Sequence, residues 1–157
     1  MKENDLTGAV NSAAAESKID KATAENEFNT YCENNGIENN TAEMDEEKLD
    51  LFKDIKNRFI KACMAGRVEV DGRSIKYKVS EFSPDGFKGE ILKMTRPAGQ
   101  AFAAMDDYKD NQRQKQSMAF ISAMTGKDVG YFKKIDIVDY RFLSDVVNLF
   151  LSFLGRQ

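Results

Sequence analysis

The sequence predicts an α+β fold, in which a small three-stranded antiparallel sheet packs against one preceding helix and two to three C-terminal helices. Apolar residues recur at helical spacing over residues 45–66. Alternating apolar and polar residues then flank the dipeptide Asp71-Gly72, and helical spacing resumes after Pro97. A chain of 157 residues is long enough to form one domain with this order of elements.

The composition is that of an ordinary globular protein and argues against several functional classes. Hydrophobic residues make up 41% of the chain and charged residues 31%, and the net charge is −3, so we expect no binding to nucleic acid. The sequence contains no histidine, which is the usual general base near neutral pH and the commonest metal ligand. Cys32 and Cys63 form no CxxC pair, which predicts free thiols in a reducing cytoplasm. No apolar segment follows Met1-Lys2, which argues against a secretory signal. We therefore expect a non-enzymatic protein without cofactor or metal.

Residues 1–43 are expected to form an acidic extension of low hydrophobicity, disordered or partly helical, ahead of a single domain over 44–157. This extension contains three Lys and nine Asp or Glu, a net charge of −6. Large apolar residues are scarce in it, as is typical of segments that cannot build a core. A helix over 17–32 would have a weak apolar face. That face consists of Ile19, Ala22, Phe28 and Tyr31.

The first well-marked helix is expected between Asp45 and Gly66. The Asp45 side chain can cap its N-terminus, and Glu46 and Glu47 suit the positive end of the helix dipole. Gly66 can end the helix in a left-handed conformation. The apolar face consists of Leu49, Phe52, Ile55, Phe59, Ile60 and Cys63.

Three strands and then further helices are expected after this helix. The turn at Asp71-Gly72 predicts a hairpin over 67–80, and a second turn at 83–86 leads to a third strand within 87–95. Pro97 suits the first turn of a helix over 97–110. A helix over 111–126, a single turn within 127–135 and a last helix over 136–154 follow, with Asp136 as the N-cap of the last one.

The last helix contains more apolar residues than one buried face requires. Its unbroken apolar part is much shorter than the roughly 20 residues that span a bilayer, so we expect no membrane insertion. One stripe at helical spacing is expected in the core. That stripe consists of Leu143, Val146, Val147, Phe150 and Leu154. The surplus outside the stripe is either deeply buried or forms a contact surface for another protein, and we expect such a contact for part of it, because large exposed apolar patches are rare on monomers. The surplus consists of Phe142, Leu149, Leu151 and Phe153, with Met118 and Met124 as weaker candidates that could instead fill the core.

Two polar patterns resemble chemical sites only superficially. Asp106 and Asp110 share a helix face, but two carboxylates make a weak magnesium site, and we expect a solvated surface there. Thr125-Gly126-Lys127 lacks the upstream glycine of a phosphate-binding loop. It is expected to end a helix.

The C-terminal two thirds, about residues 67–154, resembles the small tail assembly chaperones of tailed phages and prophages. Three motifs carry the resemblance. They are Thr95-Arg96-Pro97-Ala98-Gly99, Ala123-Met124-Thr125-Gly126, and the series Asp136, Asp139, Leu143, Val147 and Phe150-Leu151. The resemblance implies a cytoplasmic assembly factor that holds the long helical tape-measure protein before the tail tube polymerises. Such a factor is absent from the finished particle.

The partner implied by this resemblance is the tape-measure protein or another helical tail protein, with the tail tube protein and a second copy of the chain as further candidates. Neither nucleic acid nor a membrane is expected as a partner. A structural subunit of the tail or neck and a secretion-type chaperone are the alternative functions. A metal-dependent enzyme using Asp106 and Asp110 is the least favoured.

Overall fold

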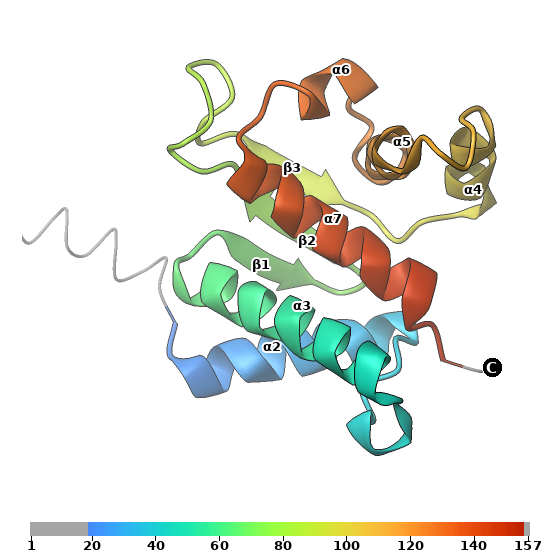
Figure 1. Cartoon of the computed structure of the whole chain (residues 1–157). Coiled ribbons are helices and arrows are strands. Elements are labelled where there is room, and N and C mark those ends of the chain that lie inside the picture. Colours follow the sequence, from blue (N-terminus) through green and yellow to red (C-terminus); the bar gives the residue numbers. More distant parts are fainter. Residues whose placement is uncertain (1–18, 156–157) are drawn as a thin grey trace, which may run out of the picture.

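The computed structural model describes residues 19–155 and places them as helices around a three-stranded antiparallel sheet (Figure 1). The predicted α+β class is therefore confirmed. The elements in chain order are α2 (Lys21–Asn35), η1 (Thr41–Glu43), α3 (Glu46–Met64), β1 (Val68–Asp71), β2 (Ser74–Lys78), β3 (Ile91–Met94), α4 (Gly99–Asp106), α5 (Arg113–Thr125), α6 (Val129–Phe132) and α7 (Ile137–Ser152). Four helices follow the sheet where two to three were expected, and α6 among them is the expected single turn. None of the helices within residues 19–155 is both long and apolar enough to cross a membrane.

The sheet has the strand order β1-β2-β3 and one buried face. Its registers place side chains in cross-strand rows that alternate between the two faces. The inward rows are Val68, Tyr77 and Leu92, and Val70, Ile75 and Met94. The row Glu69, Lys76 and Lys93 points away from the helices. Gly72 takes a φ of 61° in the β1–β2 turn, as the Asp-Gly signal predicts.

Helices cover the inward face and flank both edges of the sheet. Figure 1 shows α7 in front of the sheet, α2 and α3 at the β1 side, and α4, α5 and α6 at the β3 side. The side-chain amide of Asn34 in α2 donates to the Gly72 carbonyl over 2.9 Å. On the other side, the Thr95 amide donates to the Met124 carbonyl at the end of α5 over 2.9 Å. These bonds attach the two helical flanks to opposite sides of the sheet.

The expected helix caps are confirmed. The Asp45 carboxylate accepts the Lys48 amide over 2.8 Å, and that of Asp136 accepts the Val138 amide over 2.8 Å. Gly126 ends α5 with a φ of 75°. Local chemistry therefore determines where these helices begin and end.

The N-terminal helix α2 belongs to the core, so the boundary expected at residues 43–44 does not mark the edge of the domain. Phe28 and Tyr31 are fully buried, and the rings of Phe28 and Phe59 lie 5.1 Å apart. Ala24 is the buried alanine of this helix, in place of the expected Ala22. The first 18 residues of the expected extension lie outside the described part of the chain. A helix was expected over 17–32, but the acidic composition of this region concealed that it packs in the core through a few aromatic residues.

The same region is tied to the end of the chain. Ile37 and Leu154 form an isolated antiparallel bridge, and the Gly155 amide donates to the Gly36 carbonyl over 2.8 Å. Helix α7 ends at Ser152, and Leu154, which was expected in the buried stripe of this helix, belongs to the bridge instead and is 46% exposed. The segment that follows α2 and the C-terminal end of the described chain therefore stabilise each other.

Candidate functional site

Most of the side chains expected to bind a client are in the core, which corrects the predicted contact surface. Phe142, Leu149 and Phe153 are buried. The Phe142 ring stacks on Tyr77 at 4.6 Å, and Phe153 packs edge-on to Phe52 at 5.3 Å. Because α2 and α3 cover this side of α7, these three side chains complete the core instead of forming a contact surface.

The remaining three predicted contact residues differ in exposure. Met124 is buried at the end of α5, where its carbonyl accepts the Thr95 amide, so it fills the core. Met118 is half-buried against the core. Leu151 is 41% exposed and is the sole member of the expected surplus that reaches solvent.

The groups considered for chemistry are placed as follows. Asp106, Asp107 and Asp110 are exposed on α4 and in the loop after it. Within residues 19–155, no group of three or more metal-ligating side chains is positioned to hold an ion. Cys32 and Cys63 are buried, and burial raises the pKa of each thiol to about 12. Both thiols are therefore protonated at neutral pH, as expected for structural cysteines.

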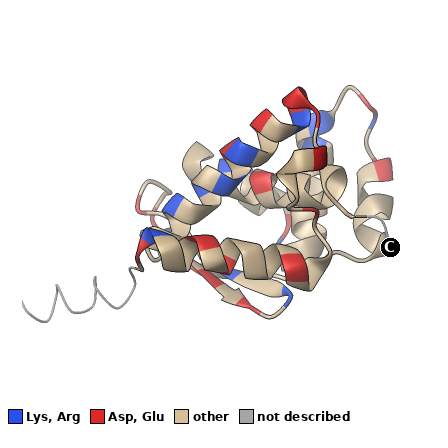
Figure 2. Cartoon of the chain, turned by 90° about the horizontal axis from the view of Figure 1, so that it is seen from below, with Lys and Arg blue, Asp and Glu red and all other residues tan. Residues whose placement is uncertain are grey.

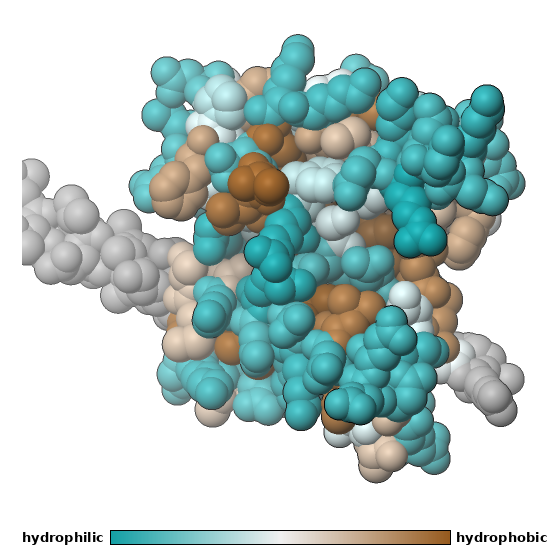
Figure 3. All heavy atoms as spheres, viewed as in Figure 1, coloured by the Kyte–Doolittle hydropathy of each residue, from teal (hydrophilic) through white to brown (hydrophobic). Residues whose placement is uncertain are grey.

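Large apolar side chains are exposed at the other end of α7, where its first turn meets the β2–β3 loop. Phe82 is 65% exposed, Ile137 76% and Val138 42%. Figure 3 shows strongly apolar atoms at the surface over the start of α7. We call Phe82, Ile137 and Val138 the apolar cluster. Exposed apolar groups held together in this way are the usual mark of an interaction surface.

A buried carboxylate holds the two parts of the apolar cluster together. Asp139, in the first turn of α7, is fully buried. It accepts hydrogen bonds from the Tyr77 hydroxyl at 2.6 Å, from the Ser80 amide and hydroxyl at 2.8 Å each, and from the Ser83 hydroxyl at 2.6 Å. Four donors occupy the acceptor positions of an ionised carboxylate. Burial, followed by the bond to Asp139, raises the pKa of Tyr77, so this hydroxyl stays protonated and remains a donor.

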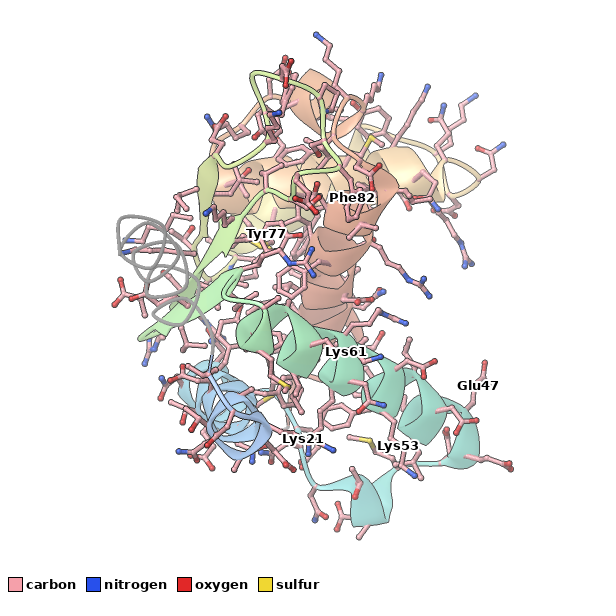
Figure 4. The ribbon with its side chains drawn as sticks, turned by 90° about the vertical axis from the view of Figure 1, so that its left-hand side faces the viewer. Lys21, Glu47, Lys53, Lys61, Tyr77 and Phe82 are labelled. Atoms are coloured by element: carbon pink, nitrogen blue, oxygen red, sulfur yellow. The ribbon has the colours of Figure 1, made fainter. Side chains whose placement is uncertain are left out.

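The same network fixes the loop that contains Phe82. The Ser83 hydroxyl also accepts the Asp136 amide over 2.8 Å, and the Phe82 amide donates to the Ser80 hydroxyl over 3.3 Å. The Gly89 amide donates to the Val79 carbonyl over 2.8 Å, and this bond closes the base of the loop. Phe82 therefore projects from a loop that is anchored on both sides. Figure 4 shows it beside the N-terminal end of α7.

A shallow groove of about 400 Å³ runs beside the exposed stripe of α7. Its lining residues are Gln114, Ile137, Val138, Tyr140, Arg141, Ser144, Asp145 and Asn148. Arg58 of α3 donates to Asp145 through Nε over 2.6 Å and through a terminal nitrogen over 3.0 Å. Burial raises the pKa of Asp145, while the bond to Arg58 acts in the opposite direction. This ion pair fixes α7 against α3 below the groove.

Sequence reasoning did not identify the apolar cluster, although one signal was available. Ile137 lies on the same helical stripe as Arg141, Ser144 and Asn148, which is otherwise polar. A large apolar residue on a polar stripe marks an exposed position. The position of Phe82 depends on the long-range bonds of Asp139, which no local pattern reveals.

The motifs that resemble tail assembly chaperones lie at junctions of the fold. The Arg96 guanidinium donates to the Asn35 carbonyl at the end of α2 and lies 5.8 Å from the centre of the Phe150 ring. Gly126 ends α5, and Asp136 caps α7. Of these motif residues, Asp136 and Asp139 are next to the apolar cluster, and Arg96 and Gly126 stabilise the ends of α2 and α5.

A comparison with models of known protein families finds no match to this chain. Searches of curated proteins and of solved structures likewise find no match. The likeness to tail assembly chaperones therefore stays a prediction from the sequence motifs.

Proposed function

We propose that this protein is a non-catalytic assembly chaperone of the phage tail type that binds a helical client in the host cytoplasm. The observation that supports this proposal most directly is the apolar cluster, whose three large side chains are held in solvent by an anchored loop and a helix N-terminus. If a partner covered about 150 Å² of one such aromatic side chain, the transfer free energy would be roughly 3 kcal/mol before the costs of association. The cluster is therefore large enough to anchor a protein contact.

The groove beside the cluster favours a helical client. The exposed stripe from Ile137 to Asn148 spans about 16 Å at about 1.5 Å of rise per residue. That length matches three turns of a partner helix, which would contact the groove through residues at i, i+3 or i+4, and i+7. The tape-measure protein, a long helical tail protein, is the client that the sequence resemblance implies.

In this proposal the surface binds a client protein and does not catalyse a reaction. The sequence predicts Leu151 as a contact and the half-buried Met118 as a weaker one, but neither belongs to the apolar cluster that we propose as the contact. The tail tube protein and a second copy of this chain are further candidate partners.

The proposal is tested by affinity capture from cells that express the neighbouring genes, followed by mass spectrometry. The wild type is compared with the Phe82→Asp/Ile137→Asp variant. Ile91→Asp is the matched control, because Ile91 is 55% exposed on the outward face of the sheet. We expect one long helical protein to be captured by the wild type and by the control, and to be lost with the double variant.

Two outcomes would contradict the proposal. If the double variant captured as much client as the wild type, the apolar cluster would not be the contact surface. Stoichiometric recovery of the protein from purified particles would instead indicate a structural tail or neck subunit. Circular dichroism of each variant shows whether the fold is retained.

A further inference from the structure

A second groove lies on the opposite side of Phe82, between the end of α3 and the end of β2. It has a volume of about 400 Å³. Its lining residues are Ala65, Gly66, Arg67, Lys78, Val79, Ser80, Glu81 and Phe82. Two cations and one exposed aromatic ring therefore share a single depression next to the apolar cluster.

Arg67 has unused hydrogen-bonding capacity in this groove. Its Nε atom is buried and has no hydrogen-bond partner among residues 19–155. The ion pairs of the described chain involve other cations, so neither Arg67 nor Lys78 is neutralised there by a carboxylate. A buried donor without an acceptor is rare in folded proteins. The groove thus contains a positive group that lacks its natural partner.

Neighbouring acids do not supply that partner. Asp139 accepts hydrogen bonds from Tyr77, Ser80 and Ser83, and these fill its acceptor positions. Glu81 lines the groove, but no ion pair links it to Arg67 or Lys78. Within residues 19–155, no ion pair therefore occupies Arg67, and its guanidinium can take an acceptor from another molecule.

We infer that this groove binds a carboxylate of a protein partner, from an Asp or Glu that is followed by a large apolar side chain. The planar guanidinium of Arg67 offers donors in a fork that matches a carboxylate, and Lys78 adds a second positive charge. The apolar neighbour packs on the exposed ring of Phe82. The source of the carboxylate, a segment of the client, rests on the proposed function.

The backbone of the groove is already in place for such a ligand. The Arg67 amide donates to the Ala62 carbonyl over 2.9 Å, and the Arg67 carbonyl accepts the Lys78 amide over 2.8 Å. The Asp139 network holds Ser80 and, through it, the loop position of Phe82. A preformed site binds with a smaller entropy cost.

A polyanion fits this groove less well than a single carboxylate does. The chain has a net charge of −3, and Figure 2 shows acidic residues interspersed with the basic ones. Glu81 would also repel a second phosphate in the groove itself. One carboxylate beside an apolar group satisfies Arg67 with less of this repulsion, because it has a single negative charge.

The test is a peptide titration of the ¹⁵N-labelled full chain, followed by NMR of the arginine Nε–H signals. The probes are the capped peptides acetyl-Leu-Glu-Phe-amide and acetyl-Leu-Gln-Phe-amide, which differ in one charge. The Arg67→Gln variant identifies the Arg67 signal by its absence. We expect a saturable shift of that signal with the Glu peptide at millimolar concentration, and binding about tenfold weaker with the Gln peptide.

Variants separate the groove from general charge effects. Phe82→Ala and Lys78→Gln are each expected to weaken binding of the Glu peptide. Arg73→Gln removes an exposed arginine in the β1–β2 turn and is expected to leave the binding unchanged. If Arg67→Gln does not fold, the Phe82 and Lys78 variants carry the test.

The inference is overturned if the Arg67 signal does not shift up to about 10 mM peptide, or if both peptides bind equally. Unchanged binding by the Phe82 and Lys78 variants would overturn it as well. Peptide binding does not require the client, so a failed affinity capture and a failed titration are independent results.

Discussion

The two ends of α7 use apolar residues in opposite ways. Near its C-terminal end, Leu149 and Phe150 are buried, and the Phe150 ring lies 6.3 Å from that of Tyr31 in α2. At the N-terminal end, Ile137 and Val138 are exposed, while the charged residue next to them, Asp139, is fully buried. The density of apolar residues along a helix therefore does not indicate which end is available to a partner. The neighbouring elements decide it, because α2 covers one end and a hydrogen-bonded loop supports the other.

The largest effect is expected from removing the element that covers the C-terminal half of α7. A chain that begins at residue 44 lacks α2, and with it the fully buried Phe28 and Tyr31. Phe59 would lose the rings of Phe28 and Tyr31, and Phe150 would lose that of Tyr31. We expect this chain to lose cooperative unfolding, as measured by urea denaturation followed by circular dichroism. A cooperative transition with unchanged midpoint would show that α2 is dispensable and that the comparison is wrong.

The second-largest loss in the free energy of unfolding is expected when a single buried ring of α7 is removed. Phe142→Ala removes the ring that stacks on Tyr77 at 4.6 Å, and it should lower the free energy of unfolding by about 3–5 kcal/mol. Asn148→Ala, at a half-buried position on the groove side of the same helix, should change it by less than about 0.5 kcal/mol. Equal effects in urea denaturation would contradict the placement of Phe142 in the core.

The N-terminal end of α7 is expected to depend on its buried carboxylate. In Asp139→Asn, the amide group cannot accept from all four donors, so at least one buried donor loses its partner. We expect a loss of about 1–3 kcal/mol in the free energy of unfolding. Limited proteolysis should also show faster cleavage within 80–89. Unchanged stability and unchanged cleavage would mean that Asp139 does not anchor the loop.

The smallest effect at neutral pH is expected from the buried thiols, because their contribution changes only under alkaline conditions. Burial raises the pKa of Cys32 and Cys63 from 9.0 to about 12. Above the ordinary pKa the unfolded chain has lost these protons while the folded chain keeps them. The free energy of unfolding therefore falls as pH rises, by up to about 1.4 kcal/mol per pH unit for each thiol. Urea denaturation above about pH 8 should show a flatter pH dependence for Cys32→Ala/Cys63→Ala than for the wild type, and identical slopes would refute burial of the thiols.

Local signals in the sequence predicted most of the fold. The caps Asp45 and Asp136 and the turn at Gly72 depend on bonds or dihedral angles within a few residues, so their positions follow from the sequence. Helix α2 was predicted as a helix, but its place in the core depends on aromatic contacts with Phe59 and Phe150, which are distant in the sequence. Because the sequence assigned α2 to an extension outside the domain, the apolar residues of α7 that α2 covers were interpreted as surplus.

The candidate surface was missed for the same physical reason. Phe82 lies in a segment with an ordinary turn pattern, and only the bonds between Ser80, Ser83 and Asp139 bring it to Ile137. These bonds join residues more than fifty positions apart in the chain. Long-range polar contacts of this kind have no periodicity that a sequence pattern could reveal.

The most direct test of the central claim compares one exposed apolar residue at each end of α7. Ile137→Asp and Leu151→Asp both place a charge at a solvent-exposed position of the same helix. Both variants should keep the wild-type melting temperature, and capture of the client from cells that express the neighbouring genes is then measured for each. The proposed surface predicts that Ile137→Asp loses the client and Leu151→Asp keeps it. Loss of the client with Leu151→Asp and its retention with Ile137→Asp would contradict the claim that the start of α7 is the contact.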